Sequence, residues 1–412
     1  MSKNQRYNIN NIAFYILIIF CLGTVASQTF SGIVVTKPFT WLLFSTALYS
    51  LLIIYNRIEK GYLNINTLLL CLLCLSLLFS VLLQMLIYPN LQETKVFEGR
   101  YAHPFLVKTT VTVILYIFIG YLIGGYNIGS KNNFSIFLLI IALFLLTLPL
   151  IGSDFTIDYS RAKVKIDHLY AGDSYYILLI FATAYSKIKN KWFIILCSTI
   201  LLFILGGRGN LLVYILTIFC YTIFLSKRKT KIFFLFFFTL IGFFLFIYFQ
   251  QIISFLLRLG LNNRMLLIGG VEADPSQIER NQQISVGISR ISEYFFVGNI
   301  SDLIIANGSI GTYMHNFMSI LQYYGIIPFV LYITLILLSL SKLFIDIKFL
   351  NTKINLDRHS NIQFRIIFLL SGIIGILTVK QGIYTILMIA FGIYSRCINP
   401  YKLIYQKYRS PK

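Results

Sequence analysis

The pair His315 and Asn316 stands where a long polar stretch of the sequence ends and an apolar run begins. A histidine at a helix start, partly exposed to water, can be neutral near pH 7 and can therefore act as a general base. A structural histidine buried against neighbouring helices is the alternative. The choice depends on which other polar residues the fold brings to the same end of the molecule.

Arg208 is the second residue suited to chemistry, and it lies between two apolar runs in the segment Gly206-Gly207-Arg208-Gly209. A guanidinium so close to a bilayer is costly unless it faces a wet cavity or an anion. The flanking glycines carry no side chains and leave room for a ligand. An arginine that reaches out to lipid phosphates is the alternative interpretation.

Four further arginines in polar segments are candidate anion ligands: Arg161, Arg264, Arg280 and Arg290. Arg290 has a surface pair with Glu293 at i,i+3 as its alternative. For Arg161, the alternative is an ordinary solvated loop that also carries Lys163 and Lys165. Several arginines together with one histidine would make an anion-binding site with a base, which favours a catalytic His315.

The composition places these residues in a membrane protein. Hydrophobic residues make up 58% of the 412 residues and charged residues 12%, which is more apolar than a soluble chain can cover with polar surface. Runs of roughly 17 to 25 apolar residues, long enough to cross a hydrocarbon core of about 30 Å, recur along the chain. We predict one all-α, polytopic membrane domain over residues 1–412, with twelve spans at 12–30, 39–55, 67–88, 106–125, 134–151, 174–186, 192–206, 210–226, 232–257, 316–341, 366–379 and 381–395.

The distribution of charge predicts the orientation, because loops rich in Lys and Arg favour the cytoplasmic side. With both termini in the cytoplasm, the inner segments hold 22 of the 35 basic residues and three of the 14 acidic residues, a net charge of +19 out of +21. The basic composition is therefore a topology signal, and we expect no nucleic-acid partner. The same rule favours separate spans at 366–379 and 381–395, because a single span there would put the basic tail outside.

The predicted inner loops are short and basic, whereas the outer face holds three segments of more complex sequence: 89–105, 152–173 and 258–315. The last, between the ninth and tenth spans, is too long for a passive connection. Within it, Asp274-Pro275-Ser276-Gln277 is typical of a helix start. Apolar residues then repeat at helical spacing at Ile284, Ile288, Ile291 and Phe295. We therefore predict an amphipathic helix over about 275–297 that lies along the outer face.

Several pieces of the sequence match one known layout. They are Gly207-Arg208-Gly209 at an outward hairpin, the 258–315 loop with Arg290, Gly311-x-x-x-His315-Asn316, and Gly325-Ile326. Together they resemble the O-antigen polymerase and O-antigen ligase superfamily of membrane glycosyltransferases. Arg161 and Gly172, with ten residues between them, resemble the arginine and spaced glycine of the polymerases. The chain departs from the family at Gly206-Gly207, where a serine more often precedes the arginine.

The resemblance implies inverting sugar transfer from an undecaprenyl-diphosphate-linked donor at the periplasmic face of the bacterial inner membrane, without a metal or other cofactor. It implies that Arg208 and Arg290 bind the diphosphate and that His315 deprotonates the acceptor hydroxyl. Fixed guanidinium groups suit this role, because their paired donors match phosphate oxygens. The residues expected to contact donor or acceptor are Arg161, Asn316, Arg264 and Arg280. The expected partners are the bilayer, the lipid-linked oligosaccharide, and a flippase and a chain-length regulator of the same pathway.

The two enzymes of the superfamily differ in their acceptor. A polymerase extends another lipid-linked repeat unit, whereas a ligase transfers the finished polymer to a lipid A core. The Arg161 loop and the Lys/Asn/Ile-rich composition favour a repeat-unit polymerase. A flippase for lipid-linked oligosaccharides is the alternative from another class, and spans nearly free of charge, with polar residues concentrated on one face, speak against it.

Overall fold

The computed structural model describes most of the predicted helical segments. The described residues are 18–19, 21, 36–59, 64–97, 100–124, 133–152, 168–185, 188–205, 208–225, 275–307, 316–351, 356–378, 380 and 382–396, with short pieces of 231–255. The predicted spans at 12–30 and 232–257 therefore lie largely outside the described residues.

The described chain is almost entirely helical, which confirms the predicted all-α class. The helices are α2 (Thr36–Glu59), α3 (Ile65–Ile87), α4 (Ala102–Ile123), α5 (Asn133–Thr147), α6 (His168–Tyr185), α7 (Ile188–Ile204), α8 (Arg208–Leu225), α10 (Pro275–Ser289), α11 (Ile291–Tyr294), α12 (Asp302–Asn307), α13 (Ser319–Tyr324), α14 (Ile326–Asn351), α15 (Leu356–Thr378) and α16 (Thr385–Arg396). Two single 3₁₀ turns, η1 (Pro89–Gln92) and η2 (Leu148–Leu150), follow α3 and α5. Strands β1 (Lys95–Phe97) and β2 (Arg100–Tyr101) form a small antiparallel ribbon between α3 and α4.

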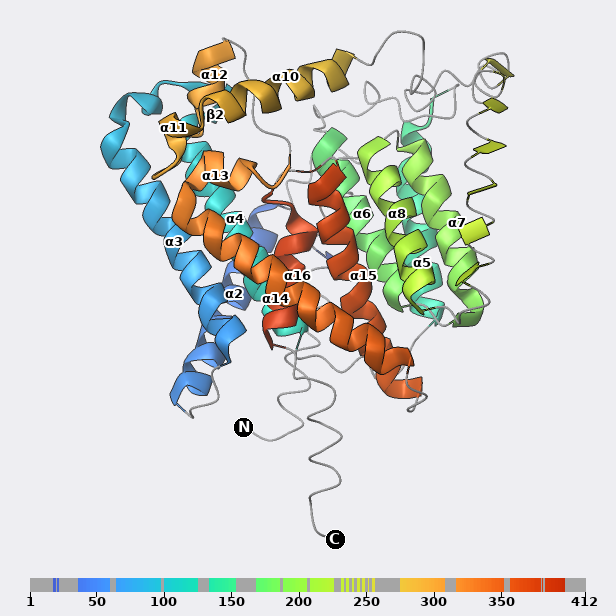
Figure 1. Cartoon of the computed structure of the whole chain (residues 1–412). Coiled ribbons are helices and arrows are strands. Elements are labelled where there is room, and N and C mark those ends of the chain that lie inside the picture. Colours follow the sequence, from blue (N-terminus) through green and yellow to red (C-terminus); the bar gives the residue numbers. More distant parts are fainter. Residues whose placement is uncertain are drawn as a thin grey trace.

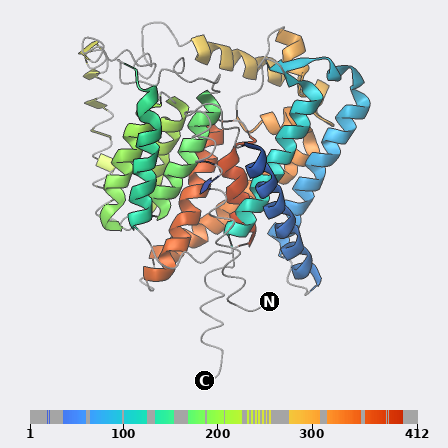
Figure 2. The same ribbon diagram turned by 180° about the vertical axis from the view of Figure 1, so that it is seen from behind.

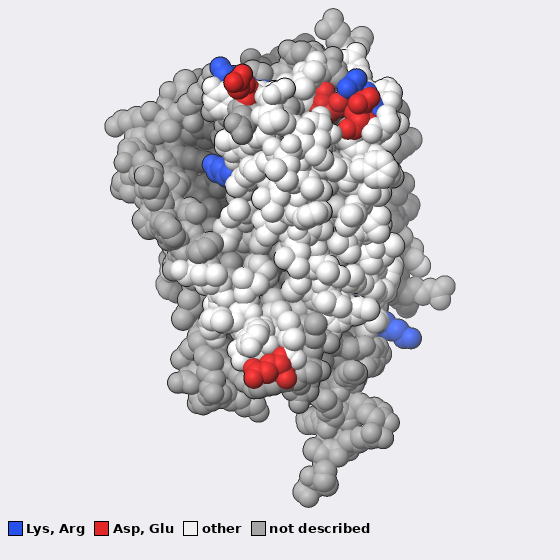
Figure 3. Space-filling model, turned by 90° about the vertical axis from the view of Figure 1, so that its left-hand side faces the viewer, with Lys and Arg blue, Asp and Glu red and all other residues white. Residues whose placement is uncertain are grey.

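Three of the described helices are long and apolar enough to cross a membrane: Ile65–Ile87, Ala102–Ile123 and Ile326–Leu350. Apolar side chains on their outer faces are exposed, among them Leu75, Phe79 and Leu337, at 62%, 58% and 61%. Such a surface suits hydrocarbon rather than water, because soluble proteins rarely expose large apolar patches. Figure 3 shows one such face, on which most charged side chains gather near the two ends.

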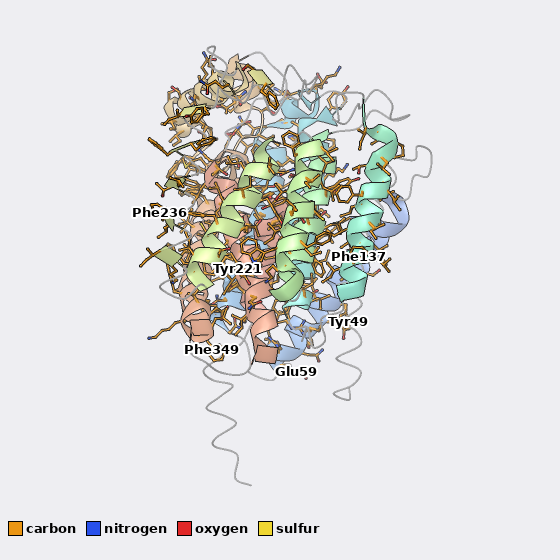
Figure 4. The ribbon with its side chains drawn as sticks, turned by 90° about the vertical axis from the view of Figure 1, so that its right-hand side faces the viewer. Tyr49, Glu59, Phe137, Tyr221, Phe236 and Phe349 are labelled. Carbon is orange, nitrogen blue, oxygen red and sulfur yellow. The ribbon has the colours of Figure 1, made fainter. Side chains whose placement is uncertain are left out.

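The helices give the molecule two distinct ends. Helices α10 to α13, which we call the cap, gather at one end of the bundle, and α10 lies across the helix ends (Figures 1 and 2). Glu59 at the end of α2 and Phe349 near the end of α14 both lie at the opposite end (Figure 4). The described part of the predicted large loop, residues 275–307, thus lies at the end of the bundle opposite Glu59 and Phe349.

Helix α16 is the central helix of the bundle. Its residues from Ile386 to Ser395 are all buried. It crosses α4 where a Cβ at Gly120 would collide with the carbonyl oxygen of Ile389, and a Cβ at Gly392 with that of Ile117. Small residues at a crossing let two backbones approach closely, which favours association of helices in a membrane.

The far end of α16 is also fixed. The Ser395 carbonyl accepts hydrogen bonds from Asn64 Nδ2 at 2.9 Å and Thr67 Oγ1 at 3.1 Å. Arg396 Nη1 donates to the Tyr121 carbonyl at 3.2 Å and to the Leu122 carbonyl at 3.1 Å. These contacts satisfy carbonyls that helix ends leave open. They fix the C-terminal end of α16 against α3 and α4.

The cap is joined to the bundle by two chain segments, 295–299 and 322–326, which we call the cap lock. Asn299 N–H donates to the Gln322 carbonyl and Ile326 N–H to the Phe295 carbonyl, each at 2.7 Å. Ser80 and Gln84, near the end of α3, reach the same segments. Ser80 Oγ lies 2.7 Å from the carbonyl oxygens of both Val297 and Tyr324. Gln84 Nε2 donates to the Tyr323 carbonyl at 2.5 Å. The lock thus fixes both ends of the segment that includes His315.

Glycines make the cap lock possible. Gly298 and Gly325 have φ of 84° and 81°, in the left-handed region that costs other residues free energy. A Cβ at Gly298 would lie 2.6 Å from the carbonyl oxygen of Tyr323, and one at Gly325 would lie 2.6 Å from the carbonyl carbon of Phe296. Each glycine therefore gives the other segment room to approach.

Two predicted helices differ from the observed ones. The predicted span at 316–341 is interrupted at Gly325, because the left-handed turn there belongs to the cap lock, and α14 runs from Ile326 instead. The predicted helix over 275–297 begins at Pro275 as expected but ends at Ser289. After the break at Arg290 (φ −104°, ψ 16°), α11 and a turn lead the chain into Gly298. The predicted segments 366–379 and 381–395 correspond to two separate helices, α15 and α16.

We expect Gly325→Ala to destabilise the protein by roughly 1–3 kcal/mol or more, because the substitution adds backbone strain and a steric clash. The readout is the thermal transition of the detergent-purified protein, with the remaining folded fraction measured by size-exclusion chromatography. Gly287→Ala is the matched control, since Gly287 lies within α10 and has no positive φ. Equal transitions for both variants would contradict the role of Gly325.

Candidate active site

The structure gives full descriptions of two predicted site residues, Asn316 and Arg290. Arg208 is the first residue of α8 and Arg280 lies within α10, and the side chains of both are outside the description. Three of the predicted residues lie outside the described residues altogether: His315, Arg161 and Arg264.

Asn316 forms the turn that starts α13. Its φ is 108°, a left-handed conformation that asparagine tolerates better than most residues. Its Oδ1 accepts from Met318 N–H at 2.8 Å, and its carbonyl accepts from Ser319 Oγ at 3.0 Å. The side chain predicted to contact substrate therefore has a structural task as well, which is to hold the chain directly after His315 in one conformation.

The start of α13 packs against the turn between α15 and α16. Ser319 Oγ accepts a hydrogen bond from Gly382 N–H at 2.8 Å. The Gly382 carbonyl accepts from Tyr332 Oη at 2.9 Å, and a Cβ at Gly382 would lie 2.6 Å from Ile320 Cγ1. Ser319 is thus bonded on one side to Asn316 and on the other to the turn.

The same turn is joined to the start of α6. Lys380 Nζ donates to Asp173 Oδ1 at 2.5 Å and lies 5.5 Å from the ring centroid of Tyr384. This pair was not predicted, and its members are 207 positions apart. A weak signal was present, because each residue is a charge at the edge of a predicted span.

The starts of α6 and α8 adjoin one another. A Cβ at Gly172 would lie 2.8 Å from Asn210 Nδ2, so only glycine fits there without displacing the amide. Asn210 is 5% exposed and follows Arg208 by two residues. The glycine that resembled a family position therefore packs next to the turn that carries the predicted arginine.

These contacts form one continuous series at the cap end. They join α8 near Arg208 to α6, α6 to the turn before α16, and that turn to Asn316. Helices α6, α8 and α16 begin at this end (Figure 1), and helix starts carry partial positive charge that attracts anions. The start of α8 at Arg208 and the start of α13 after Asn316 are thus connected by one series of contacts.

Arg290 lies elsewhere in the cap and has an acidic partner. Its Nη2 and Nε donate to the two carboxylate oxygens of Asp302 at 2.7 and 3.0 Å. The Arg290 side chain is 37% exposed and that of Asp302 is 4% exposed. The hydrogen bond to Asp302 raises the pKa of the Arg290 guanidinium above its usual value. The alternative surface partner Glu293 is not the residue to which Arg290 donates.

The Arg290 pair is connected to the cap lock rather than to Asn316. Asp302 N–H donates to the Asn299 carbonyl at 3.3 Å, and Asn299 N–H donates to Gln322. Arg290, which was predicted to bind the diphosphate, therefore uses one edge of its guanidinium to bind the Asp302 carboxylate within the cap. Its remaining donors lie on the partly exposed side.

We expect Asp302→Ala to lower the thermal transition of the purified protein, by an amount that corresponds to about 1–3 kcal/mol. Adding Arg290→Ala should cost little more, because residues in one ion pair do not act independently. Glu293→Ala is the control and should have little effect. Strictly additive losses for Asp302→Ala and Arg290→Ala would count against the pair as an anchor of the cap.

Within the described residues, no three His, Cys, Asp or Glu side chains come close enough to hold a metal ion. The chain matches no protein-family model and no curated protein. The described residues define its class: an almost entirely helical protein with three helices long and apolar enough to span a membrane, and a series of polar contacts at one end of the bundle.

Proposed function

We propose that this chain is a polytopic polymerase of surface polysaccharide, which joins undecaprenyl-diphosphate-linked repeat units at the periplasmic face of the bacterial inner membrane. In this proposal the chain has twelve spans, both termini are cytoplasmic, and the cap faces the periplasm. The observation that carries the proposal is the series of contacts from Asn210 to Asn316. It supports a common site for Arg208 and His315, which the sequence motifs single out for separate reasons.

In the proposed reaction, the acceptor hydroxyl oxygen attacks the anomeric carbon of the donor sugar. A new C–O bond forms while the bond from that carbon to the diphosphate breaks, and the configuration inverts. His315 takes the proton of the hydroxyl, and Arg208 meets the charge that develops on the departing diphosphate. Preorganised cations of this kind act most strongly where water is excluded. Arg290 binds the diphosphate only through the edge of its guanidinium that is not bonded to Asp302.

A ligase would place the same groups around a different acceptor, a lipid A core. The distribution of described charges favours an enzyme of either kind over a flippase. Ion pairs lie toward the two ends, as Asp173–Lys380 and Arg365–Asp346 do, whereas transporters commonly place ionisable groups near the midplane.

Deletion of the gene in its host, followed by gel analysis of the surface polysaccharide, tests the proposal. The polymerase predicts a single repeat unit on the lipid core, restored to a ladder by the wild-type chain. A bare core with accumulated lipid-linked polymer would make the protein a ligase. Repeat units stranded on the inner leaflet would make it a flippase, and either outcome would overturn the proposal.

A further inference from the structure

The Asp173–Lys380 pair is the least explained polar feature at the cap end. The Lys380 side chain is 14% exposed and that of Asp173 is 30% exposed, so water or a ligand reaches the pair. Lys380 engages Oδ1 of Asp173, and within the described part of the chain nothing else bonds to the carboxylate. The pair therefore presents an open acceptor beside a fixed donor.

Lys380 is held more rigidly than lysines usually are. Its backbone N–H donates to the Gly375 carbonyl at 2.8 Å, and its ammonium lies over Tyr384, an arrangement that attracts cations to the ring face. The absence of a side chain at Gly375 makes room for that ring, since a Cβ there would lie 2.5 Å from Tyr384 Cε1. Tyr176 stacks on Tyr384 with centroids 6.4 Å apart. A side chain ordered in advance loses little freedom when it binds a ligand.

The position of the pair is the second observation. Asp173 follows Gly172, which packs against Asn210 near Arg208. Lys380 precedes Gly382, which bonds to Ser319 at the start of α13. The pair is thus linked on one side to the start of α8, which Arg208 begins, and on the other to the start of α13, which follows His315 in the sequence. In the proposed reaction, the donor sugar lies between the diphosphate and the base.

The charge of the pair indicates the kind of ligand. One carboxylate and one ammonium together are neutral, so a phosphate would meet the repulsion of Asp173 and a cation that of Lys380. Neighbouring hydroxyl groups fit both members, because a hydroxyl can donate to the carboxylate and accept from the ammonium. Hydrogen bonds to charged groups are also stronger than neutral ones.

From this geometry we infer that Asp173 and Lys380 form a subsite for a neutral sugar residue of the repeat unit. Asp173 accepts a hydrogen bond from one hydroxyl, and Lys380 donates to a neighbouring hydroxyl. The inference rests on the proposed function, which supplies the sugar substrate, and it assigns to this pair a role in substrate binding rather than in proton transfer.

The test uses the full-length protein in liposomes with lipid-linked repeat units extracted from the deletion strain. We expect Asp173→Asn and Lys380→Gln each to raise KM for the repeat unit about tenfold, since a lost hydrogen bond to a charged group has roughly that effect, with a smaller change in kcat. Asp346→Asn, in the ion pair of the opposite end, is the control and should leave KM unchanged. An unchanged KM in Asp173→Asn would overturn the inference.

A purely structural ion pair is separated from a sugar subsite by exchanging the charges. The double variant Asp173→Lys/Lys380→Asp preserves an attraction between α6 and the turn that precedes α16 but reverses the donor and the acceptor. We expect KM to stay raised in this variant. Recovery of the wild-type KM would show that the pair is only a structural ion pair and would overturn the inference.

A second measurement is independent of turnover. The probe is the free oligosaccharide released from the same lipid by mild acid, and its binding is followed by saturation-transfer NMR. Binding to the wild type but not to Asp173→Asn supports the subsite even if the wild type makes no polymer, an outcome that would reject the proposed function alone. Equal binding to both proteins would reject the subsite.

Discussion

His315→Ala is expected to abolish visible chain extension while the protein still reaches the membrane. Loss of a general base lowers a rate by about 10²–10⁴-fold, which on a polysaccharide gel leaves single repeat units in place of a ladder. The physical reason for choosing this histidine is its position directly before Asn316, whose turn is bonded to Ser319 and through it to the turn at Gly382. A base needs such a fixed support.

The control for this variant is His359→Ala. His359 lies in the first turns of α15, at the end of the bundle opposite the cap, so its removal should leave the ladder intact. Full chain extension by His315→Ala would remove the assignment of the base. An equal loss of chain extension in both variants would indicate an effect on folding rather than the loss of a catalytic base.

Arg208→Lys is expected to lower the polymerisation rate by about tenfold to a hundredfold, although the charge is kept. Lysine lacks the planar pair of donors that matches two phosphate oxygens, and an oxyanion ligand is worth most in a site shielded from water. Arg208 is the first residue of α8, two residues before the buried Asn210, and helix starts attract anions. The measurement is the initial rate with purified lipid-linked repeat units.

Arg57→Lys is the matched control for the arginine variant. Arg57 lies in the last turn of α2, where Nη1 is 3.3 Å from Tyr121 Oη, far from the cap end of the bundle. We expect its replacement to leave the rate nearly unchanged. A wild-type rate for Arg208→Lys would instead indicate an arginine that only reaches lipid phosphates.

Apolar runs and loop charges were sufficient to predict the helices and the separation of the last two. Each predicted segment from 39–55 to 210–226, and each after 316, contains a helix. The start at Pro275 also followed from local rules, because proline fits the first helical position. These features depend on residues that are neighbours in sequence.

Features that depend on distant contacts could not be predicted in this way. Hydropathy continues through Gly325, so the apolar pattern alone does not mark the break between α13 and α14, although Gly325 and Pro328 are typical of a helix end and a helix start. The break follows from the approach of residues 295–299. Helix α10 ends at Ser289, so Arg290 and Glu293 do not lie on one continuous helix, and Asp302 is the residue to which Arg290 donates. The Asp173–Lys380 pair, too, exists only because α6 packs beside the final hairpin.

The most direct test of the proposed polymerase uses the purified protein alone, reconstituted in liposomes with purified lipid-linked repeat units. The proposal predicts a ladder of lipid-linked products that grow by one repeat unit at a time, and its absence with His315→Ala. Intact single repeat units after incubation with the folded wild-type protein would contradict the proposal.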